Sequence, residues 1–164
     1  MNKTRLLIAL LGALAAPAWA TEYHNGDHAR PVLHADEVAI GHPAQMTAVD
    51  RTISVSVSDA ADGSMAFDAT EILVRKGETI RFVLSNDGSE NHEFVMGTQE
   101  EITGHLDEMQ SAADMRHDAP FAVRVRPGET GELLWTFSNE GSFVFASLIP
   151  GQYEAGMHGR LTVE

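Results

Sequence analysis

Short segments in which polar and apolar residues alternate follow one another from residue 51 onward, separated by turns that contain glycine or proline. Alternation with a period of two is typical of a strand that is buried on one face only. The pattern predicts strands over residues 52–57, 71–74, 79–84, 92–95, 121–125, 132–137, 141–146 and 161–163. Strands of this number and spacing indicate an all-β fold, a Greek-key antiparallel β-sandwich.

One segment inside this series has a different character. Residues 99–109 have a helical composition and predict one short helical insertion in the middle of the sandwich. The chain has 164 residues, of which 43% are hydrophobic, and this is enough for one domain with its own core. We therefore expect a single domain over residues 51–164.

The first twenty residues have the composition of a cleaved export signal. Lys3 and Arg5 precede a short apolar run over residues 6–16, and a cleavage site of the A-x-A type ends at Ala20. The apolar run is shorter than the roughly 20 residues that a membrane-spanning helix needs. We expect cleavage between Ala20 and Thr21, a periplasmic protein, and no insertion into a membrane.

Residues 21–50 predict a flexible acidic arm, because they show little periodicity. The arm carries four of the eight histidines, namely His24, His28, His34 and His42. Neutral imidazoles on a mobile segment can chelate Cu(II), Zn(II) or Ni(II) weakly. An arm without a metal-binding role remains the alternative.

The charge and the cysteine content exclude several classes of function. Without Lys3 and Arg5 the chain keeps 9 basic residues against 24 acidic ones, a formal charge of −15. Such a charge argues against nucleic acid as a partner and favours cations or basic proteins. The chain has no cysteine, so it can form neither a disulfide nor a thiolate ligand for a metal.

Three ordered segments carry a resemblance to a known family. They are residues 75–82, the run Asn91-His92-Glu93-Phe94, and residues 148–157, which contain Pro150-Gly151 and end in Gly156-Met157. Together they resemble the strand-turn-strand, the first-ligand segment and the ligand loop of cupredoxins. The similarity is greatest to the exported copper-resistance and plastocyanin-like branch, and it covers the chain from about residue 50 to residue 164.

The resemblance implies which positions would hold copper. The family's ligand loop contains a Cys, a His and an axial Met, each separated by four residues, and a distant His completes the set. His92 stands at the distant imidazole and Met157 at the axial thioether, whereas Ser147 replaces the thiolate and Gln152 the second imidazole. Because a serine hydroxyl stays protonated near neutral pH and a glutamine oxygen is a weak substitute for imidazole, we expect no ordinary blue-copper centre.

Two interpretations of this position stay open. His92 and Met157 form a nitrogen–sulfur pair, and thioethers favour Cu(I), so the pair could bind copper with Gln152 as a supporting oxygen. Alternatively, the site is empty, with His92 hydrogen-bonded under the loop and Met157 packed in the core.

Other imidazoles and thioethers are auxiliary metal candidates: Met96, His105, Met109, Met115, His117 and His158. Met96 and His158 could add donors to the loop site. His105 and Met109 are four residues apart and would share a face of the expected helix. The resemblance makes a surface Cu(I) patch plausible here, while packing of the methionines in the core is an equal alternative.

No catalytic motif is present, and we expect that the protein is not an enzyme. Ser147 does not lie in a Gly-x-Ser-x-Gly elbow, and the sequence contains no metalloprotease, phosphate-loop or dinucleotide motif. The expected function is copper homeostasis or resistance, with copper as the ligand and a copper-delivery or redox protein as a partner. The alternatives are a metal-free interaction module, or an electron carrier if Ser147 and Gln152 are engineered replacements.

Overall fold

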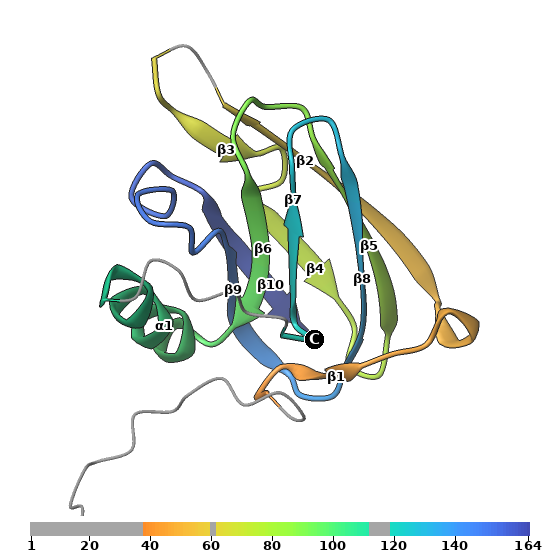
Figure 1. Cartoon of the computed structure of the whole chain (residues 1–164). Coiled ribbons are helices and arrows are strands. Elements are labelled where there is room, and N and C mark those ends of the chain that lie inside the picture. Colours follow the sequence, from red (N-terminus) through yellow and green to blue (C-terminus); the bar gives the residue numbers. More distant parts are fainter. Residues whose placement is uncertain (1–37, 60–61, 112–118) are drawn as a thin grey trace, which may run out of the picture.

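The computed structural model describes residues 38–59, 62–111 and 119–164, without the side chains of residues 108–111. Two five-stranded sheets lie face to face, and a helix lies beside them (Figure 1). The first sheet has the order β1 (Gly41–Pro43), β8 (Thr130–Phe137), β5 (Thr79–Asn86), β2 (Arg51–Asp59) and β3 (Met65–Phe67). The second has the order β4 (Glu71–Val74), β10 (His158–Val163), β9 (Gly141–Ala146), β6 (His92–Gly97) and β7 (Ala122–Val125). A short 3-10 helix, η1 (Met46–Ala48), follows β1, and α1 (Gln99–Ser111) follows β6.

The predicted all-β sandwich with a helical insertion is confirmed, but its sheets are mixed rather than purely antiparallel. β2 pairs with β5 in parallel, and β10 pairs with β4 in parallel. Alternation of polar and apolar residues indicates which face of the sheet each side chain lies on. It carries no information on whether the neighbouring strand runs parallel or antiparallel. β1 and β3 were not expected from the sequence, because each is only three residues long.

The last part of the expected arm is built into the first sheet. β1 pairs antiparallel with β8, and Ile40 just before it is fully buried. His42 lies on β1 with an exposed side chain, and its Nδ1 is 3.1 Å from the carbonyl oxygen of Pro43. Residues 38–50 therefore belong to the sandwich. The expected export signal and His24, His28 and His34 lie outside the described residues.

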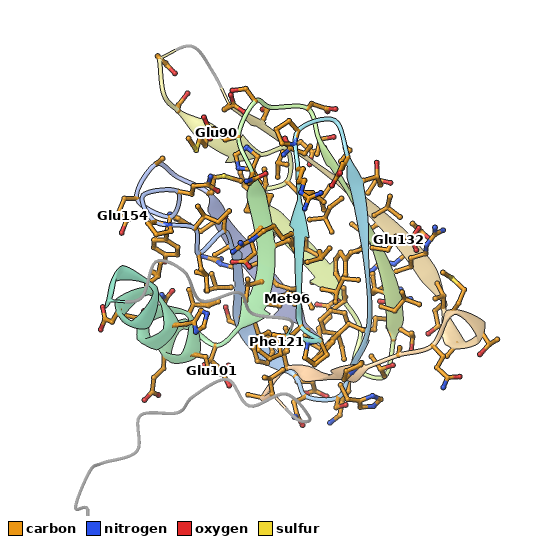
Figure 2. The ribbon with its side chains drawn as sticks, in the orientation of Figure 1. Glu90, Met96, Glu101, Phe121, Glu132 and Glu154 are labelled. Carbon is orange, nitrogen blue, oxygen red and sulfur yellow. The ribbon has the colours of Figure 1, made fainter. Side chains whose placement is uncertain are left out.

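Aromatic side chains fill the space between the two sheets (Figure 2). Neighbouring rings in this cluster have centroids 5.3 to 6.3 Å apart, and its members are Phe67, Phe82, Phe94, Phe137 and Phe145. Phe94 stacks on Phe145 with centroids 5.4 Å apart. Phe94 lies two residues after His92 on β6, and Phe145 lies two residues before Ser147 on β9. Packing of these two rings therefore holds β6, which begins with His92, against β9, which Ser147 directly follows.

Candidate metal centre

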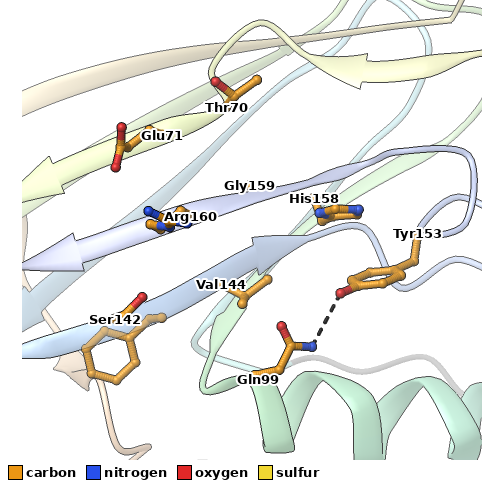
Figure 3. Close-up of a pocket in the computed structure, with 10 residues that line it drawn as sticks. Thr70, Glu71, Gln99, Ser142, Val144, Tyr153, His158, Gly159 and Arg160 are labelled. Carbon is orange, nitrogen blue, oxygen red and sulfur yellow. Dashed lines mark hydrogen bonds between the residues drawn. The ribbon is translucent and has the colours of Figure 1, made fainter.

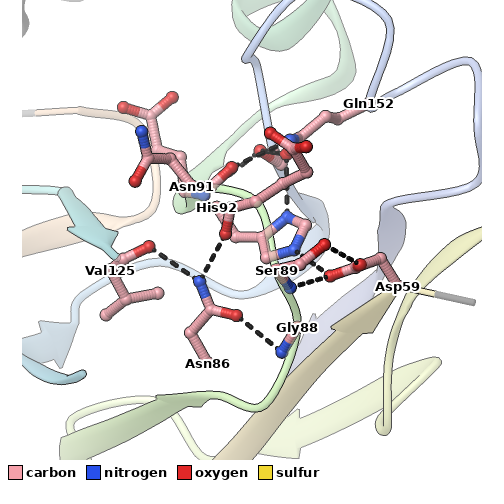
Figure 4. A network of polar contacts seen from close by, with 11 residues as sticks. Asp59, Asn86, Gly88, Ser89, Asn91, His92, Val125 and Gln152 are labelled. Carbon is pink, nitrogen blue, oxygen red and sulfur yellow. Dashed lines mark hydrogen bonds and ion pairs between the residues drawn. The ribbon is translucent and has the colours of Figure 1, made fainter. Parts of the chain in front are cut away.

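A turn held by Asn86 brings His92 into the interior. The side-chain amide of Asn86 donates hydrogen bonds to the carbonyl oxygens of Glu90 at 2.7 Å and of Val125 at 3.0 Å. Its oxygen accepts the backbone N–H of Gly88 at 2.9 Å (Figure 4). These three bonds fix the path of the chain between β5 and β6. His92, the first residue of β6, has no exposed surface.

The loop between β9 and β10 joins Ser147, Gln152 and Met157 through its backbone. The N–H of Gln152 donates to the carbonyl of Ile149 at 3.0 Å, closing a turn in which Gly151 has a φ of +85° that favours glycine. The carbonyl of Gln152 accepts the N–H of Met157 at 3.0 Å, and the carbonyl of Met157 accepts the N–H of Ser147 at 2.9 Å. These backbone bonds set the mutual positions of the three residues by themselves.

The side chains of His92, Ser147 and Gln152 form a closed polar cluster. The amide oxygen of Gln152 lies 3.0 Å from Nδ1 of His92 and 2.7 Å from Oγ of Ser147. The amide nitrogen of Gln152 donates to the carbonyl of Asn91 at 2.8 Å, so the oxygen must face the other two side chains, which both donate to it. Oγ of Ser147 in turn accepts the N–H of Glu93 at 3.2 Å. All three side chains of the cluster are buried.

Met157 completes the set of positions that the resemblance indicates. Its side chain has no exposed surface, and its backbone is bonded to both Gln152 and Ser147. The structure thus brings the four expected positions to one end of the second sheet. Coordination of a metal by them stays a prediction.

The donors of this cluster fit a weak copper site and do not fit a blue-copper centre. They comprise one imidazole nitrogen, an amide oxygen and a hydroxyl, with a thioether in the same loop, whereas a blue-copper centre needs two imidazoles and a thiolate. Nowhere in the described residues, the cluster included, are three His, Cys, Asp or Glu side chains grouped as metal ligands would be. The only buried polar side-chain atom without a partner in the described part is Nε1 of Trp135, in the other sheet. A metal at the cluster would therefore compete with hydrogen bonds that already exist.

Asp59, which was not expected near the site, lies on the far side of the His92 ring. Oδ1 of Asp59 is 3.5 Å from Nε2 of His92. Ser89 donates its N–H to Oδ1 at 2.6 Å and its hydroxyl to Oδ2 at 2.7 Å. The hydroxyl bond, followed by the backbone bond, lowers the pKa of Asp59 from its ordinary value. No sequence signal pointed to Asp59, because 33 residues separate it from His92 and it simply ends an alternating strand.

Met96 does not join the cluster. It lies four residues after His92 on β6, which corresponds to about 13 Å along a strand. Its side chain is fully buried in the core, and its N–H donates to the carbonyl of Phe121 at 3.3 Å (Figure 2). Met96 is therefore a packing residue, and contrary to the expectation it does not add a donor at the cluster.

His158 faces away from the cluster, toward a polar pocket of about 690 Å³ on the outer side of the same loop (Figure 3). Its ring stacks on that of Tyr153 with centroids 4.6 Å apart, and Gln99 of α1 donates to the Tyr153 hydroxyl at 3.3 Å. Successive residues of a strand point to opposite faces. His158 is exposed for this reason while its neighbour Met157 is buried.

The other auxiliary candidates remain predictions. His105 lies half-buried on α1 and has interactions of its own. The side chain of Met109, together with Met115 and His117, lies outside the described residues. In the described part of the chain, no helix is long and apolar enough to cross a membrane.

Comparison with known proteins places the fold and the cluster in a family context. Residues 53–164 match the family of copper-binding proteins of the plastocyanin/azurin type. The copper-resistant cuproprotein CopI of Rubrivivax gelatinosus is 44% identical over 158 residues, which cover 96% of this chain and 93% of the relative. CopI of Pseudomonas aeruginosa is 37% identical over 155 residues, which cover 77% of this chain and 83% of the relative.

Among solved structures, auracyanin B has a similar fold. It superposes with a TM-score of 0.61 at 23% sequence identity, over 79% of this chain and 98% of that one. This likeness concerns the sandwich and not the identity of the side chains in the loop.

Proposed function

Since the chain belongs to the plastocyanin/azurin family of copper-binding proteins, in its copper-resistance branch, we propose that it is an exported protein that binds or buffers copper without a thiolate-based centre. His92 and Met157 would supply an imidazole nitrogen and a thioether, and Gln152 would supply an oxygen. The pair of nitrogen and sulfur donors favours Cu(I). The periplasm is the expected location, because the first twenty residues have the composition of an export signal.

One observation carries this proposal. The side chains at three of the four ligand positions meet within hydrogen-bond distance of a single atom, Oε1 of Gln152, inside the protein. The fourth, Met157, is tied to two of them through the backbone. Their convergence supports a remodelled site.

The chemistry of the side chains limits what such a site can do. Bound copper would supply a soft cation held by imidazole and thioether, without the copper–thiolate bond that gives blue-copper centres their intense colour. His92 would present Nδ1, because this nitrogen faces Ser147 and Gln152 while Nε2 faces Asp59. Ser147 would position Gln152 by donating a hydrogen bond to its oxygen. These roles suit storage or transfer of copper better than rapid electron transfer.

An anaerobic Cu(I) competition titration tests the proposal on the protein that starts at Thr21. We expect one Cu(I) per chain in the wild type and loss of this copper in His92→Ala. His158→Ala is the matched control, because it removes an exposed imidazole that directly follows the loop and faces the outer pocket. A variant in which the four histidines of the expected arm become alanine separates the loop from the arm. Copper that is lost only in this arm variant would overturn the loop site.

A second function is favoured by the completeness of the hydrogen bonds in the cluster. His92, Ser147 and Gln152 satisfy one another without any metal, as expected of a metal-free interaction module. The melting temperature separates the two functions. A ligand at a hundredfold excess over its dissociation constant stabilises a fold by about 2.7 kcal/mol. For a domain of this size that corresponds to a rise on the order of 10 °C, and a melting temperature indifferent to Cu(I) would favour the module.

A further inference from the structure

The outer pocket has no part in the proposed copper site. It lies on the outer face of the second sheet, where side chains of β4, β9 and β10 meet the first residue of α1 (Figure 3). Its volume is about 690 Å³. Pockets that hold small molecules in proteins have volumes of about 300 to 1,000 Å³. The outer pocket therefore has room for a small ligand of its own.

Two opposite charges stand side by side in the outer pocket. Arg160 and Glu71 are register partners in the parallel pair of β10 and β4. Their chain neighbours Leu161 and Ile72 are buried, so alternation directs both charged side chains to the outer face, where they are exposed. In the part of the chain that the structure describes, the guanidinium of Arg160 has no ion pair with Glu71 or with any other carboxylate. The pocket thus presents an available cation beside a carboxylate.

A planar surface lies next to this pair of charges. His158 precedes Arg160 by two residues on β10, so both side chains lie on the outer face, about 7 Å apart along the strand. The His158 ring stacks on that of Tyr153 with centroids 4.6 Å apart. Gln99 fixes the Tyr153 ring from α1 by donating to its hydroxyl at 3.3 Å. The two rings lie on one side of the pocket and the charges on the other (Figure 3).

We propose that the outer pocket binds a free α-amino acid with a planar side chain. The guanidinium of Arg160 binds the carboxylate of this ligand, because its planar array of donors matches a carboxylate in two parallel hydrogen bonds. Glu71 binds the ammonium group, and the rings of Tyr153 and His158 pack against the side chain. An amino acid carries these three groups on one carbon skeleton, at the short spacing that the neighbouring strands provide.

The charges of the pocket favour a zwitterion over a simple ion. A ligand with a carboxylate alone is repelled by Glu71 and by a chain whose formal charge is −13. A ligand with an ammonium group alone is repelled by Arg160. A zwitterion pairs with both side chains and carries no net charge. This inference is independent of the proposed function, because neither Arg160 nor Glu71 belongs to the cluster of His92, Ser147 and Gln152.

An NMR titration of the metal-free protein with L-phenylalanine tests the inference, because this amino acid has no metal-binding side chain. We expect the backbone amide signals of Gln99, Tyr153 and Arg160 to move and to saturate. Three analogues each lack one of the recognised groups: 3-phenylpropionate lacks the ammonium group, 2-phenylethylamine lacks the carboxylate, and L-alanine lacks the ring. We expect each analogue to bind at least about tenfold more weakly than L-phenylalanine, because it loses a charged hydrogen bond or the packing of the ring.

Variants of the two charged residues assign the contacts. Arg160→Gln and Glu71→Gln should each weaken the binding of L-phenylalanine at least about tenfold. Glu71→Gln should also abolish the preference for L-phenylalanine over 3-phenylpropionate, and Arg160→Gln the preference over 2-phenylethylamine. Arg126→Gln is the matched control, because Arg126 is an exposed arginine outside the pocket, 3.8 Å from Glu129, and it should change the affinity less than twofold. Melting curves check that the variants are folded.

The titrations separate this inference from its alternatives. If L-phenylalanine causes no saturable movement of the signals, the pocket is not an amino-acid site and the inference is overturned. If 3-phenylpropionate or 2-phenylethylamine binds the wild type as tightly as L-phenylalanine, the pocket recognises a simple ion, which overturns it as well. An equal loss of affinity in Arg126→Gln and Arg160→Gln would show binding driven by overall charge and would also overturn it. None of these measurements involves copper, so a protein that binds no copper leaves the inference in force.

Discussion

The amide oxygen of Gln152 lies 3.0 Å from Nδ1 of His92, and this contact closes the cluster at the end of the second sheet. The oxygen also accepts the hydroxyl of Ser147, so one atom joins three of the four positions that the cupredoxin resemblance assigns to copper. The cluster is therefore a self-contained polar core as well as a candidate metal site. Its two properties lead to different expectations for substitution.

Restoring the two missing ligand types should rebuild a blue-copper centre. In the double variant Ser147→Cys and Gln152→His, a thiolate and a second imidazole replace the hydroxyl and the amide at positions that the backbone already holds together. We expect copper binding with an intense charge-transfer band in the visible spectrum. Ser147→Cys alone, which lacks the second imidazole, should give a weaker or altered band. If the copper-loaded double variant lacks such a band, the geometry of the loop has diverged along with its ligands.

Removal of the Gln152 side chain should destabilise the metal-free protein. In Gln152→Ala, Nδ1 of His92 and the hydroxyl of Ser147 lose their shared acceptor in a buried place. An unsatisfied buried polar group costs about 1 to 3 kcal/mol, and urea unfolding measures this cost. Gln99→Ala is the control, because the Gln99 side chain is exposed, and it should change stability by less than about 0.5 kcal/mol. Equal effects of the two substitutions would contradict a structural role of the cluster.

The stability of the fold should fall in acid partly because of Glu78. Hydrogen bonds from Arg51 at 2.9 and 3.1 Å, together with the N–H of Arg75, lower the pKa of Glu78 from its ordinary value of 4.5. A carboxylate with a lowered pKa in the folded state stabilises the fold above about pH 4.5 and loses this contribution as the pH falls through the lowered value.

Glu78→Gln should reduce stability at neutral pH by about 0.5 to 1 kcal/mol and weaken its dependence on pH below 4.5. Urea unfolding at a series of pH values measures both effects. Glu140→Gln is the control, since Glu140 and its partner Lys76 are exposed and 3.7 Å apart. A pH dependence that is the same in Glu78→Gln as in the wild type would refute the contribution of Glu78.

Two glycines offer opposite expectations for the same substitution. A Cβ atom at Gly159 would lie 2.1 Å from the ring of Phe145, its partner across β10 and β9, so Gly159→Ala should destabilise by about 1 to 3 kcal/mol. A Cβ atom at Gly104 in α1 would meet nothing within 4 Å, so Gly104→Ala should stabilise by up to about 1 kcal/mol. Thermal unfolding of both variants checks the signs, and a stabilising Gly159→Ala would mean that Phe145 has room to move.

Local sequence signals were sufficient for much of the sandwich and for the loop. The resemblance of residues 147–157 to the cupredoxin ligand loop predicted that Ser147, Gln152 and Met157 share one loop, and backbone hydrogen bonds join the three residues in the structure. The alternation in residues 52–57 and 79–84 predicted β2 and β5, because the buried face of a strand is recorded in its own sequence.

Contacts between distant segments could not be predicted in the same way. The parallel pairing of β2 with β5 and the position of Asp59 behind His92 depend on how separate strands meet in space. β1 has only three residues, too few for a pattern, and it was assigned to the arm. The hydrogen-bonded state of His92 was one of two open interpretations, and only the positions of the Gln152 and Ser147 side chains show that it exists.

The parallel pairing of β10 with β4 makes the ligand loop depend on the completion of the second sheet. β10 lies between β4 and β9, and the backbone of Glu164 bonds to that of Val74 and Lys76. Strands from distant parts of the chain pair late in folding, since a long loop must be closed first. Met157 immediately precedes β10, so until this strand has paired, the second sheet lacks the link between β4 and β9 that holds the end of the ligand loop. If the cluster holds copper as proposed, the site is complete only once β10 has closed the second sheet.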